Sequence, residues 1–400
     1  MTEGSKYTRQ PIVSVLGHVD HGKTSVLDII RGSTVADRES GAITQHIGAT
    51  EVPIDAIHKV CGDLLKGKNF TLPGLLFIDT PGHHAFTTLR SRGGSLADIA
   101  ILVVDVTEGF KPQTYESINI LKQYKTPFII AANKIDAISG WQKTKGNAKQ
   151  RINNQRANVK TVFEENIYEM IGTLSENKIN SNLYYQISDF RKTAGIVPIS
   201  AKTGEGISEL LMVLVGLAQR FLEEKLQIET GPGKGTVLEV KEEVGLGKTI
   251  DTIIYNGTIK SDDSIVIGTM NEPIVTRIRA LLKPKPLDEI RDPRERFDSV
   301  KEVHAASGIK IASPDLENVI PGAPIRVASE NNIDEIIEEI KNQTKMDYEL
   351  DEQGILIKAD TIGSLEALIK ESRDKGIEIR KAEIGNVSKR DIIEADATTD

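Results

Sequence analysis

A glycine-rich segment near the N-terminus has the spacing of a phosphate-binding loop. The segment Gly17–Thr24 reads GHVDHGKT, and loops of this spacing wrap backbone N–H groups around a phosphate at the start of a helix. We expect Lys23 to reach the β- and γ-phosphates and the Thr24 hydroxyl to bind Mg²⁺. A glycine-rich turn can match the spacing by chance, but here an apolar run precedes it and a helical pattern follows. The residues predicted to bind nucleotide are Asp20, His21, Gly22, Lys23, Thr24 and Ser25.

A second group, Asp79-Thr80-Pro81-Gly82, follows another apolar run. We expect Asp79 to hold the magnesium ion through water and the Gly82 N–H to sense the γ-phosphate. A Pro-Gly turn after a strand is common, so this group gains its meaning from the phosphate loop that precedes it.

Two further groups have the chemistry of a guanine reader. Guanine presents an N1–H and an N2 amine from which one carboxylate can accept both hydrogen bonds, and adenine lacks that pair. We therefore expect Asp136 to select GTP over ATP, Asn133 to support the loop and face the N7/O6 edge, and the Lys134 stem to pack along the base. In the group Ser200, Ala201 and Lys202, a backbone N–H would bond O6 and the Lys202 stem would cover the other face. Together the four groups predict an enzyme that binds and hydrolyses GTP.

The elements that must position these groups are short apolar runs alternating with amphipathic segments. Runs of this kind are typical of strands buried on both faces of a parallel sheet, and in such sheets ligands bind at the carboxyl ends of the strands. The sequence therefore predicts an α/β fold with a doubly wound, mostly parallel sheet. The expected strands are 12–16, 75–78, 99–104, 128–132 and 196–199.

The pattern changes after residue 226. A turn-rich junction at 229–235 is followed by short alternating segments, which predict a small β-barrel, and Asn256-Gly257 indicates a hairpin turn. An acidic amphipathic segment then predicts a connecting helix, and two strands with a helix begin another α/β unit. The expected domains are a GTP-binding domain at 1–226, a barrel at 227–330, a helix at 331–346 and an incomplete α/β domain at 347–400.

Composition excludes some classes of protein. With one cysteine, Cys61, no internal disulfide can form, which suits a reducing cytoplasm. The longest apolar run is far shorter than the ~20 residues of a membrane helix, and the net charge of −8 argues against nonspecific coating of nucleic acid. A zinc site is an alternative use for the histidines near the motifs, but the isolated Cys61 and the phosphate-loop backbone disfavour it. These histidines are His18, His21, His46, His83 and His84.

The stretch from Ala137 to Phe163 contains basic residues and no acidic ones. A solvated insertion and a surface facing ribosomal RNA explain this composition equally well. The basic residues are Lys143, Lys145, Lys149, Arg151, Arg156 and Lys160.

These motifs resemble those of the translational GTPases, in which a histidine follows the Asp-x-Pro-Gly turn. Here that residue is His83. The resemblance implies that His83 orients the attacking water, the role that glutamine has in signalling GTPases.

Residues 41–49, GAITQHIGA, resemble the first switch segment of initiation factor 5B and its bacterial relative, initiation factor two. The resemblance implies that Thr44 closes on Mg²⁺ and the γ-phosphate in the GTP state. It also implies that Asp20 holds a monovalent cation, K⁺ or Na⁺, beside the phosphates.

The long segment after Asp136 and the short segment before Ile12 favour the archaeal branch of this family. We expect the chain to lack the C-terminal part, including the domain that holds initiator tRNA. The resemblance implies a monomeric factor that contacts both ribosomal subunits and another initiation factor, promotes subunit joining, and is released after ribosome-stimulated GTP hydrolysis.

Two other functions fit parts of the sequence. An elongation- or selenocysteine-type factor would share the nucleotide motifs, but the segment at 43–48 disfavours it. A binding module that holds nucleotide without hydrolysing it would not need Lys23, Thr24, Asp79 and His83 together. GTPase assays with and without ribosomes would separate these functions.

Overall fold

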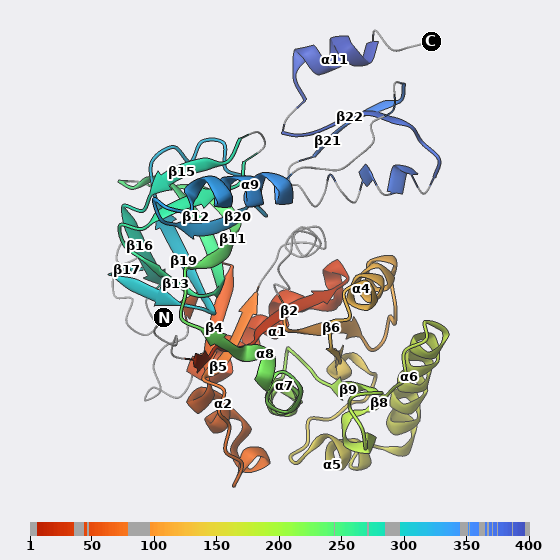
Figure 1. The fold of residues 1–400 in the computed structure, drawn as a ribbon. Coiled ribbons are helices and arrows are strands. Elements are labelled where there is room, and N and C mark those ends of the chain that lie inside the picture. The colour runs from red at the N-terminus through yellow and green to blue at the C-terminus, as the bar shows by residue number, and fades with distance from the viewer. Residues whose placement is uncertain are drawn as a thin grey trace.

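The computed structural model of the 400-residue chain has three parts, which follow one another along the sequence (Figure 1). An α/β domain carries the predicted nucleotide motifs, a β domain follows it, and a small α/β unit ends the chain. The structure describes residues 6–35, 44–45, 48–78, 97–243, 245–269, 272–284, 297–344, 351, 353–359, 365, 368–369, 371–373, 375–385 and 387–396.

The first domain is built on an eight-stranded sheet whose core strands are parallel, which confirms the predicted doubly wound fold. The edge strands β3 and β4 run antiparallel to their neighbours. The strands, in spatial order, are β3 (Thr44–Gln45), β4 (Ala49–Pro53), β5 (Gly74–Ile78), β2 (Ile12–Gly17), β6 (Ile99–Asp105), β7 (Phe128–Asn133), β9 (Ala194–Pro198) and β8 (Ser181–Leu183).

Helices cover both faces of this sheet, so its central strands are buried on both sides. Ile101 of β6 packs into the core shared with α1, α2 and α7, whereas the adjacent Leu102 packs into the core shared with α4 and α6 (Figure 1). This double burial explains why the strand sequences are continuously apolar. The helices are α1 (Lys23–Val35), α2 (Ile54–Cys61), α4 (Pro112–Gln123), α5 (Ala148–Asn153), α6 (Ala157–Glu176), α7 (Ile207–Phe221) and α8 (Glu223–Leu226).

The second domain is a curved antiparallel sheet around an aliphatic core. Its main strands, in spatial order, are β15 (Ile274–Arg277), β14 (Ser264–Ile267), β20 (Pro324–Ala328), β11 (Lys234–Glu243), β12 (Gly247–Asn256), β19 (Ser307–Ala312), β16 (Ala280–Pro284) and β17 (Phe297–Val300). Strand β13 (Thr258–Lys260) pairs separately with β18 (Glu302–His304).

The hairpin predicted at Asn256-Gly257 is wrong. Strand β12 ends at Asn256 and pairs with β11 and β19, whereas β13 leaves to pair with β18. Gly257 has φ +69°, and a Cβ there would lie 2.3 Å from the Pro232 carbonyl oxygen. The position therefore requires glycine because the backbone at residue 257 passes close to the backbone at Pro232. The neighbouring residues alone do not distinguish such a crossing from a two-residue turn.

The two larger domains meet along β4, β5 and β19. Ala49 and Ile78 pack with Ile253 in a small apolar cluster. Glu51 accepts a 2.5 Å hydrogen bond from Ser307 and pairs with Lys283 at 3.0 Å.

The segment at residues 6–12 contacts both domains and the linker between them. Strand β1 (Lys6–Thr8) pairs with β10 (Gln227–Glu229) in the linker. Arg9 makes a two-pronged pair with Asp98 at 2.6 and 2.9 Å, and Gln10 donates to the Ala306 carbonyl at 2.8 Å. The linker is thus a two-stranded ribbon.

The third part begins with helix α9 (Ile333–Thr344), which lies on the β domain against β14 and β20. Strands β21 (Ile355–Ala359) and β22 (Ile379–Ile384) pair in parallel, and α11 (Lys389–Asp396) contacts β21. Figure 1 shows this unit apart from the first domain. Among the described residues, no helix has the length and apolar character required to cross a bilayer.

Candidate nucleotide-binding site

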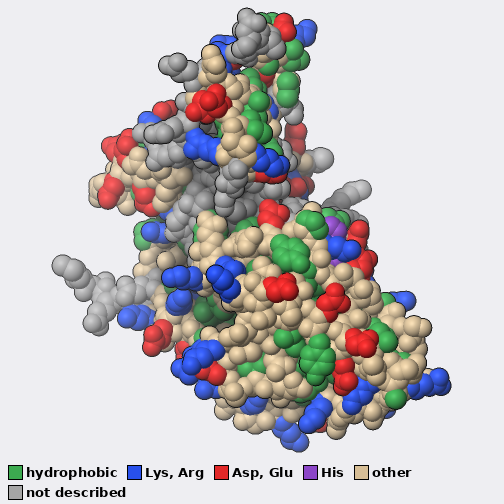
Figure 2. Space-filling view, turned by 90° about the vertical axis from the view of Figure 1, so that its right-hand side faces the viewer, with side chains coloured by type: hydrophobic (Ala, Val, Ile, Leu, Met, Phe, Trp, Pro, Cys, Tyr) green, Lys and Arg blue, Asp and Glu red, His purple; other side chains and the backbone are tan. Residues whose placement is uncertain are grey.

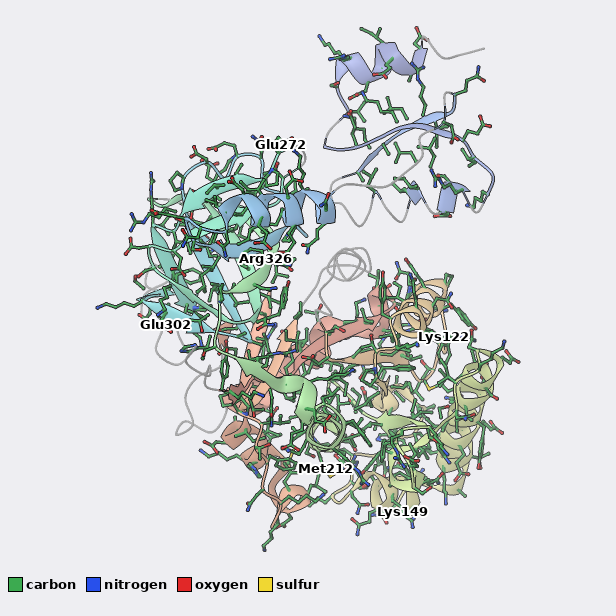
Figure 3. The ribbon with its side chains drawn as sticks, in the orientation of Figure 1. Lys122, Lys149, Met212, Glu272, Glu302 and Arg326 are labelled. Atoms are coloured by element: carbon green, nitrogen blue, oxygen red, sulfur yellow. The ribbon has the colours of Figure 1, made fainter. Side chains whose placement is uncertain are left out.

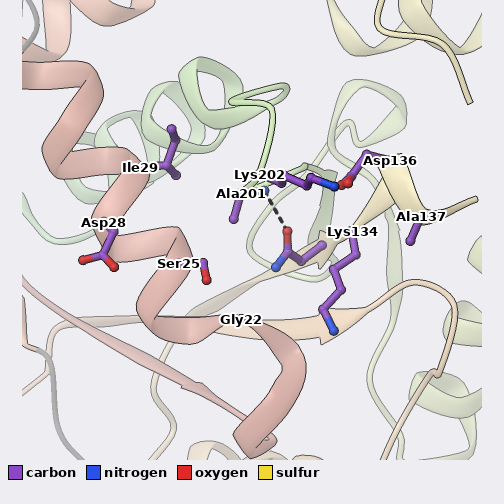
Figure 4. A pocket seen from close by; sticks show the side chains of 10 residues that line it. Gly22, Ser25, Asp28, Ile29, Lys134, Asp136, Ala137, Ala201 and Lys202 are labelled. Atoms are coloured by element: carbon purple, nitrogen blue, oxygen red, sulfur yellow. Dashed lines mark hydrogen bonds between the residues drawn. The ribbon is translucent and has the colours of Figure 1, made fainter.

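The predicted nucleotide groups meet at the carboxyl ends of neighbouring strands. Strand β2 ends at Gly17, β7 ends at Asn133, and Ser200 lies just beyond the end of β9. A cavity of about 650 Å³ opens there (Figure 4). Its lining residues are Gly22, Ser25, Asp28, Ile29, Asn133, Lys134, Asp136, Ala137, Ala201 and Lys202.

The phosphate loop is held by its own lysine and by glycines that admit close packing. The Lys23 ammonium donates to the carbonyls of Gly17 and His18 at 2.9 and 2.8 Å, which places a positive charge against the loop at the start of α1. Gly17 has φ +139°, and a Cβ there would lie 2.3 Å from the Val103 carbonyl oxygen. Any larger residue at 17 would push the loop away from β6.

The Asn133 side chain, at the start of the loop that carries Asp136, joins the phosphate loop to the loop that carries Ser200, Ala201 and Lys202. Its amide nitrogen donates to the His21 carbonyl and its oxygen accepts from the Ala201 N–H, both at 2.9 Å. The second bond is the dashed line in Figure 4. Since Asn133 is 1% exposed, both bonds are shielded from water, and together they fix the separation of the two loops.

Asp136 is held by the third strand end. Ser200 donates a 2.5 Å hydrogen bond to one Asp136 carboxylate oxygen, and the Ser200 hydroxyl in turn accepts from the Thr203 N–H at 3.0 Å. This leaves the other Asp136 carboxylate oxygen for a ligand in the cavity. A carboxylate oriented in this way suits a base edge that offers two N–H donors.

Lys134 is fixed by a buried carboxylate that sequence reasoning missed. Its ammonium lies 2.7 Å from Asp105, at the end of β6, and its backbone has φ +63°. Burial would raise the pKa of Asp105, but hydrogen bonds from Lys134 and Thr107 outweigh burial and hold the pKa below its ordinary value. The pair therefore holds the Lys134 stem along the cavity wall. The terminal aspartate of the apolar run ILVVD was the available signal.

Of the residues predicted to bind nucleotide, His21 has a side chain turned away from polar partners. The His21 ring is buried, and neither ring nitrogen has a hydrogen-bond partner among the described residues. Burial lowers the pKa of His21, while nearby Asp105 opposes the shift. His21 thus serves the site through its backbone carbonyl, and its ring packs beside His18 at 5.1 Å between centroids.

Helix α1 also supplies cavity residues that the motif search missed. Asp28 and Ile29 follow Ser25 by three and four positions, so all three share one face of the helix. That spacing was visible in the sequence. Gln113 of α4 was not predictable, because only the fold brings it to 2.8 Å from His18 Nδ1 and 3.1 Å from the Val19 N–H.

The remaining predicted residues are those assigned to metal ions, to the γ-phosphate and to the attacking water. Asp79, Gly82 and His83 lie outside the described residues, and only the backbone of Thr44 is described, in β3. Thr24 is exposed in the first turn of α1, and Asp20 is exposed in the short helix Val19–His21. The described residues contain no group of three His, Cys, Asp or Glu side chains that could hold a metal ion. Thr24 directly follows Lys23 in the first turn of α1, which is the place in the sequence of the Ser or Thr that holds Mg²⁺ in P-loop nucleotide hydrolases.

The fold and the site define the class of this protein. A phosphate loop bonded through an asparagine to an aspartate-bearing base loop, at the edge of a doubly wound sheet, is the arrangement of a guanine-nucleotide-binding P-loop protein. Two known families match the chain. "Elongation factor Tu GTP binding domain" covers residues 8–220, and "Translation-initiation factor 2" covers residues 326–400.

Comparison with individual proteins shows to which family within this class the chain belongs. A protein named "Probable translation initiation factor IF-2" from Methanocella arvoryzae is 57% identical over 100% of this chain and 67% of its own length. Its namesake from Methanopyrus kandleri is 53% identical over 100% of this chain and 68% of its own length. The chain belongs to the archaeal family of translation initiation factor IF-2, within the translational GTPases. It spans about two thirds of the length of these relatives.

Solved structures agree with this assignment. The GDP-bound aIF5B from Aeropyrum pernix has a TM-score of 0.89 and 49% identity, and the match covers 98% of this chain and 66% of that one. The elongation factor SelB from Methanococcus maripaludis has a TM-score of 0.52 and 20% identity, with coverage of 80% and 55%. The second likeness shows a shared fold alone, so the initiation-factor prediction is confirmed over the selenocysteine-type alternative.

Proposed function

We propose that this chain binds GTP in the cavity between the phosphate loop and the Asp136 loop and hydrolyses it during translation initiation. The observation that supports this most directly is the pair of Asn133 bonds, which join the start of the Asp136 loop to the phosphate loop and to the Ala201 backbone at one cavity. In the GTP state the factor would promote joining of the ribosomal subunits in the cytoplasm. Hydrolysis stimulated by the ribosome would then release it.

Magnesium is part of this proposal. Thr24, Thr44 and Asp79 would hold the ion, which supplies charge neutralisation at the β- and γ-phosphates when bound. Lys23 would bind the same phosphates from the loop side. Asp20 would hold a K⁺ or Na⁺ ion, and His83 would orient the attacking water.

We further propose that the chain is divided at residues 226, 330 and 346. Helix α8 ends at Leu226 and the ribbon strand β10 begins at Gln227, which supports the first boundary. The ribosome and its RNA are the proposed partners, together with another initiation factor. Initiator tRNA would bind the part of the relatives that this chain does not span.

A nucleotide-binding and hydrolysis series tests the proposal. Fluorescent GDP should bind and be displaced by GTP but not by ATP. Hydrolysis should be slow for the chain alone and faster with ribosomal subunits. His83→Ala should bind GTP like the wild type but lose most of the stimulated rate. Equal displacement by ATP would refute the base reader, and wild-type turnover by His83→Ala would refute the assigned water-orienting role.

We also propose a narrower RNA surface than the predicted basic stretch. Arg151 is buried and therefore unavailable, whereas Lys145, Lys149 and Arg156 are exposed. Figure 3 shows Lys149 at the lower edge of the first domain. Figure 2 shows charges of both signs interspersed over the face it views, so the described residues form no continuous basic surface on that face. Reversing these three charges should weaken ribosome binding and flatten its salt dependence. Reversing the charges of Lys59 and Lys66, which lie on another face, should leave ribosome binding and its salt dependence unchanged.

A further inference from the structure

Two basic side chains connect the segment 137–186 to the loop that follows β9 and to helix α7. The Lys143 ammonium donates to the Thr203 carbonyl at 2.6 Å. The Arg151 guanidinium of α5 lies 2.8 Å from the Glu209 carboxylate of α7. Both residues belong to the stretch whose composition suggested RNA binding, yet both contact the protein itself.

The pair of Arg151 and Glu209 is enclosed. Their side chains are 8% and 1% exposed. Arg151 also donates to the Gly146 carbonyl at 2.6 Å, and Ser208 donates to Glu209 at 3.0 Å. The Glu209 oxygen nearest Arg151 lacks hydrogen-bond geometry, so the attraction between the two is chiefly Coulombic, and burial strengthens it.

Two other titratable groups near Glu209, Cys61 and Tyr184, are neutral. Burial, and then the charge of Glu209, raise the pKa of Cys61 to about 12 and also raise the pKa of Tyr184. Both groups are therefore uncharged at neutral pH, and neither a thiol nor a phenol can carry the positive charge that would balance Glu209. Among the described residues, Arg151 is the cation that Glu209 contacts, so its loss would leave a buried carboxylate without its ion-pair partner.

Glu209 and Thr203 are both close in the structure to the loop that carries Ser200, Ala201 and Lys202. It is the third residue of α7, whose N-cap Gly206 has φ +80° and would place a Cβ 2.2 Å from the Pro198 carbonyl oxygen. Thr203, which receives Lys143, donates its N–H to Ser200, and Ser200 donates to Asp136. A shift of Thr203 therefore reaches the base-reading carboxylate through two hydrogen bonds, and a shift of α7 reaches the end of β9 through the close approach of Gly206 to Pro198.

We propose that the segment 137–186 braces the guanine-reading loop, with Arg151 as the main positioning residue and Lys143 as a second one. The brace rests on the proposed nucleotide binding and extends it. The brace slows release of the bound nucleotide, because contacts outside the cavity hold the loop that carries Ser200, Ala201 and Lys202 in a fixed position. The residues do not touch the nucleotide cavity themselves.

The test compares release of fluorescent GDP from matched variants. Arg151→Met keeps the apolar stem and removes the charge, and we expect release to be about tenfold faster or more. Lys143→Met removes an exposed contact, and we expect GDP release to be about twofold faster. Lys145→Met and Arg156→Met remove exposed charges of the same segment and should release GDP at the wild-type rate. Arg151→Lys should restore part of the retention.

A second readout separates positioning from lost stability. Leu121→Ala truncates a buried residue of α4 that lies outside both the cavity and the segment 137–186, and it should lower the Tm at least as much as Arg151→Met does. It should nevertheless leave the GDP release rate unchanged. Arg151→Met should also weaken discrimination between GDP and inosine diphosphate, which lacks the N2 amine, because Asp136 loses its fixed position.

The outcomes are distinct. Failure of the wild type to bind GDP would overturn the proposed function. Wild-type binding with unchanged release and discrimination in Arg151→Met and Lys143→Met would overturn the brace alone. Equal acceleration in Leu121→Ala would also overturn it, because loss of stability would then explain the effect. If Arg151→Met does not fold, Lys143→Met against Lys145→Met decides the question.

Discussion

The contact between Gly22 and Asn133 allows a quantitative test of how the two loops are joined. Gly22 has φ +89°, and a Cβ there would lie 2.6 Å from the Asn133 amide nitrogen, while the next neighbour, Ser25, is 4.0 Å away. Gly22→Ala should therefore displace the Asn133 amide as well as strain the backbone. Asn133→Ala removes the same amide directly.

The expected energies follow from the bonds. Asn133→Ala leaves the His21 carbonyl and the Ala201 N–H buried without that partner, at roughly 1–3 kcal/mol each. Gly22→Ala adds about 1–3 kcal/mol for a non-glycine residue at positive φ. In the Asn133→Ala background the new methyl meets no amide, so only the backbone strain remains. The loss of GDP-binding free energy in the double variant should therefore be smaller than the sum of the two single losses by about 2–3 kcal/mol. This difference corresponds to roughly 30- to 150-fold in affinity.

The assay is the dissociation constant for fluorescent GDP in the wild type, both single variants and the double variant. Gly172→Ala is the matched control, because Gly172 lies in α6 and a methyl group added there would meet nothing within 4 Å; this variant should bind GDP like the wild type. Additive losses within about 0.5 kcal/mol would show that Gly22 and Asn133 act independently, and the described joining of the loops would be wrong.

Three further predictions concern pH, reactivity and the domain contact. Because the folded-state pKa of Asp105 lies below 3.8, its pairing stabilises the fold at neutral pH and that stabilisation is lost as the pH falls below this value. Lys134→Met should lower the unfolding free energy at pH 7 by about 1–2 kcal/mol and flatten its decline in acid, as measured by urea titration. With a pKa of about 12 and a buried position, Cys61 should react with iodoacetamide far more slowly in the native protein than in denaturant; equal rates would contradict its burial. Ile253→Ala should cost about 2–5 kcal/mol, whereas Val275→Ala, at an exposed position, should cost little.

Much of the first domain was predictable because its strands are buried on both faces. Such strands are apolar without interruption and end at polar residues, so the runs at 99–104 and 128–132 located both the sheet and its functional edge. The motif spacing then placed Gly22, Asn133 and Asp136 at one cavity. Local signals were sufficient because each motif lies within a few residues of a strand end.

The remainder depended on contacts between distant residues. Asp105 became part of the site through its pair with Lys134, and Gln113 through its contact with His18. Arg151 was predicted with the exposed basic residues because composition does not reveal a partner on another helix. Gly257 shows the same limit, since a glycine at a turn and a glycine at a backbone crossing have identical sequence signatures.

The ribbon formed by β1 and β10 has a practical consequence for work with this protein. A single strand between two domains is a tether, but a paired strand resists bending, and here the second strand comes from the start of the chain. Because Arg9 and Gln10 then join that segment to Asp98 and Ala306, deleting residues 6–10 would remove contacts with both domains and leave every residue that lines the nucleotide cavity in the chain. A fluorophore attached at Lys6 would therefore lie beside the linker strand β10 and not at the cavity.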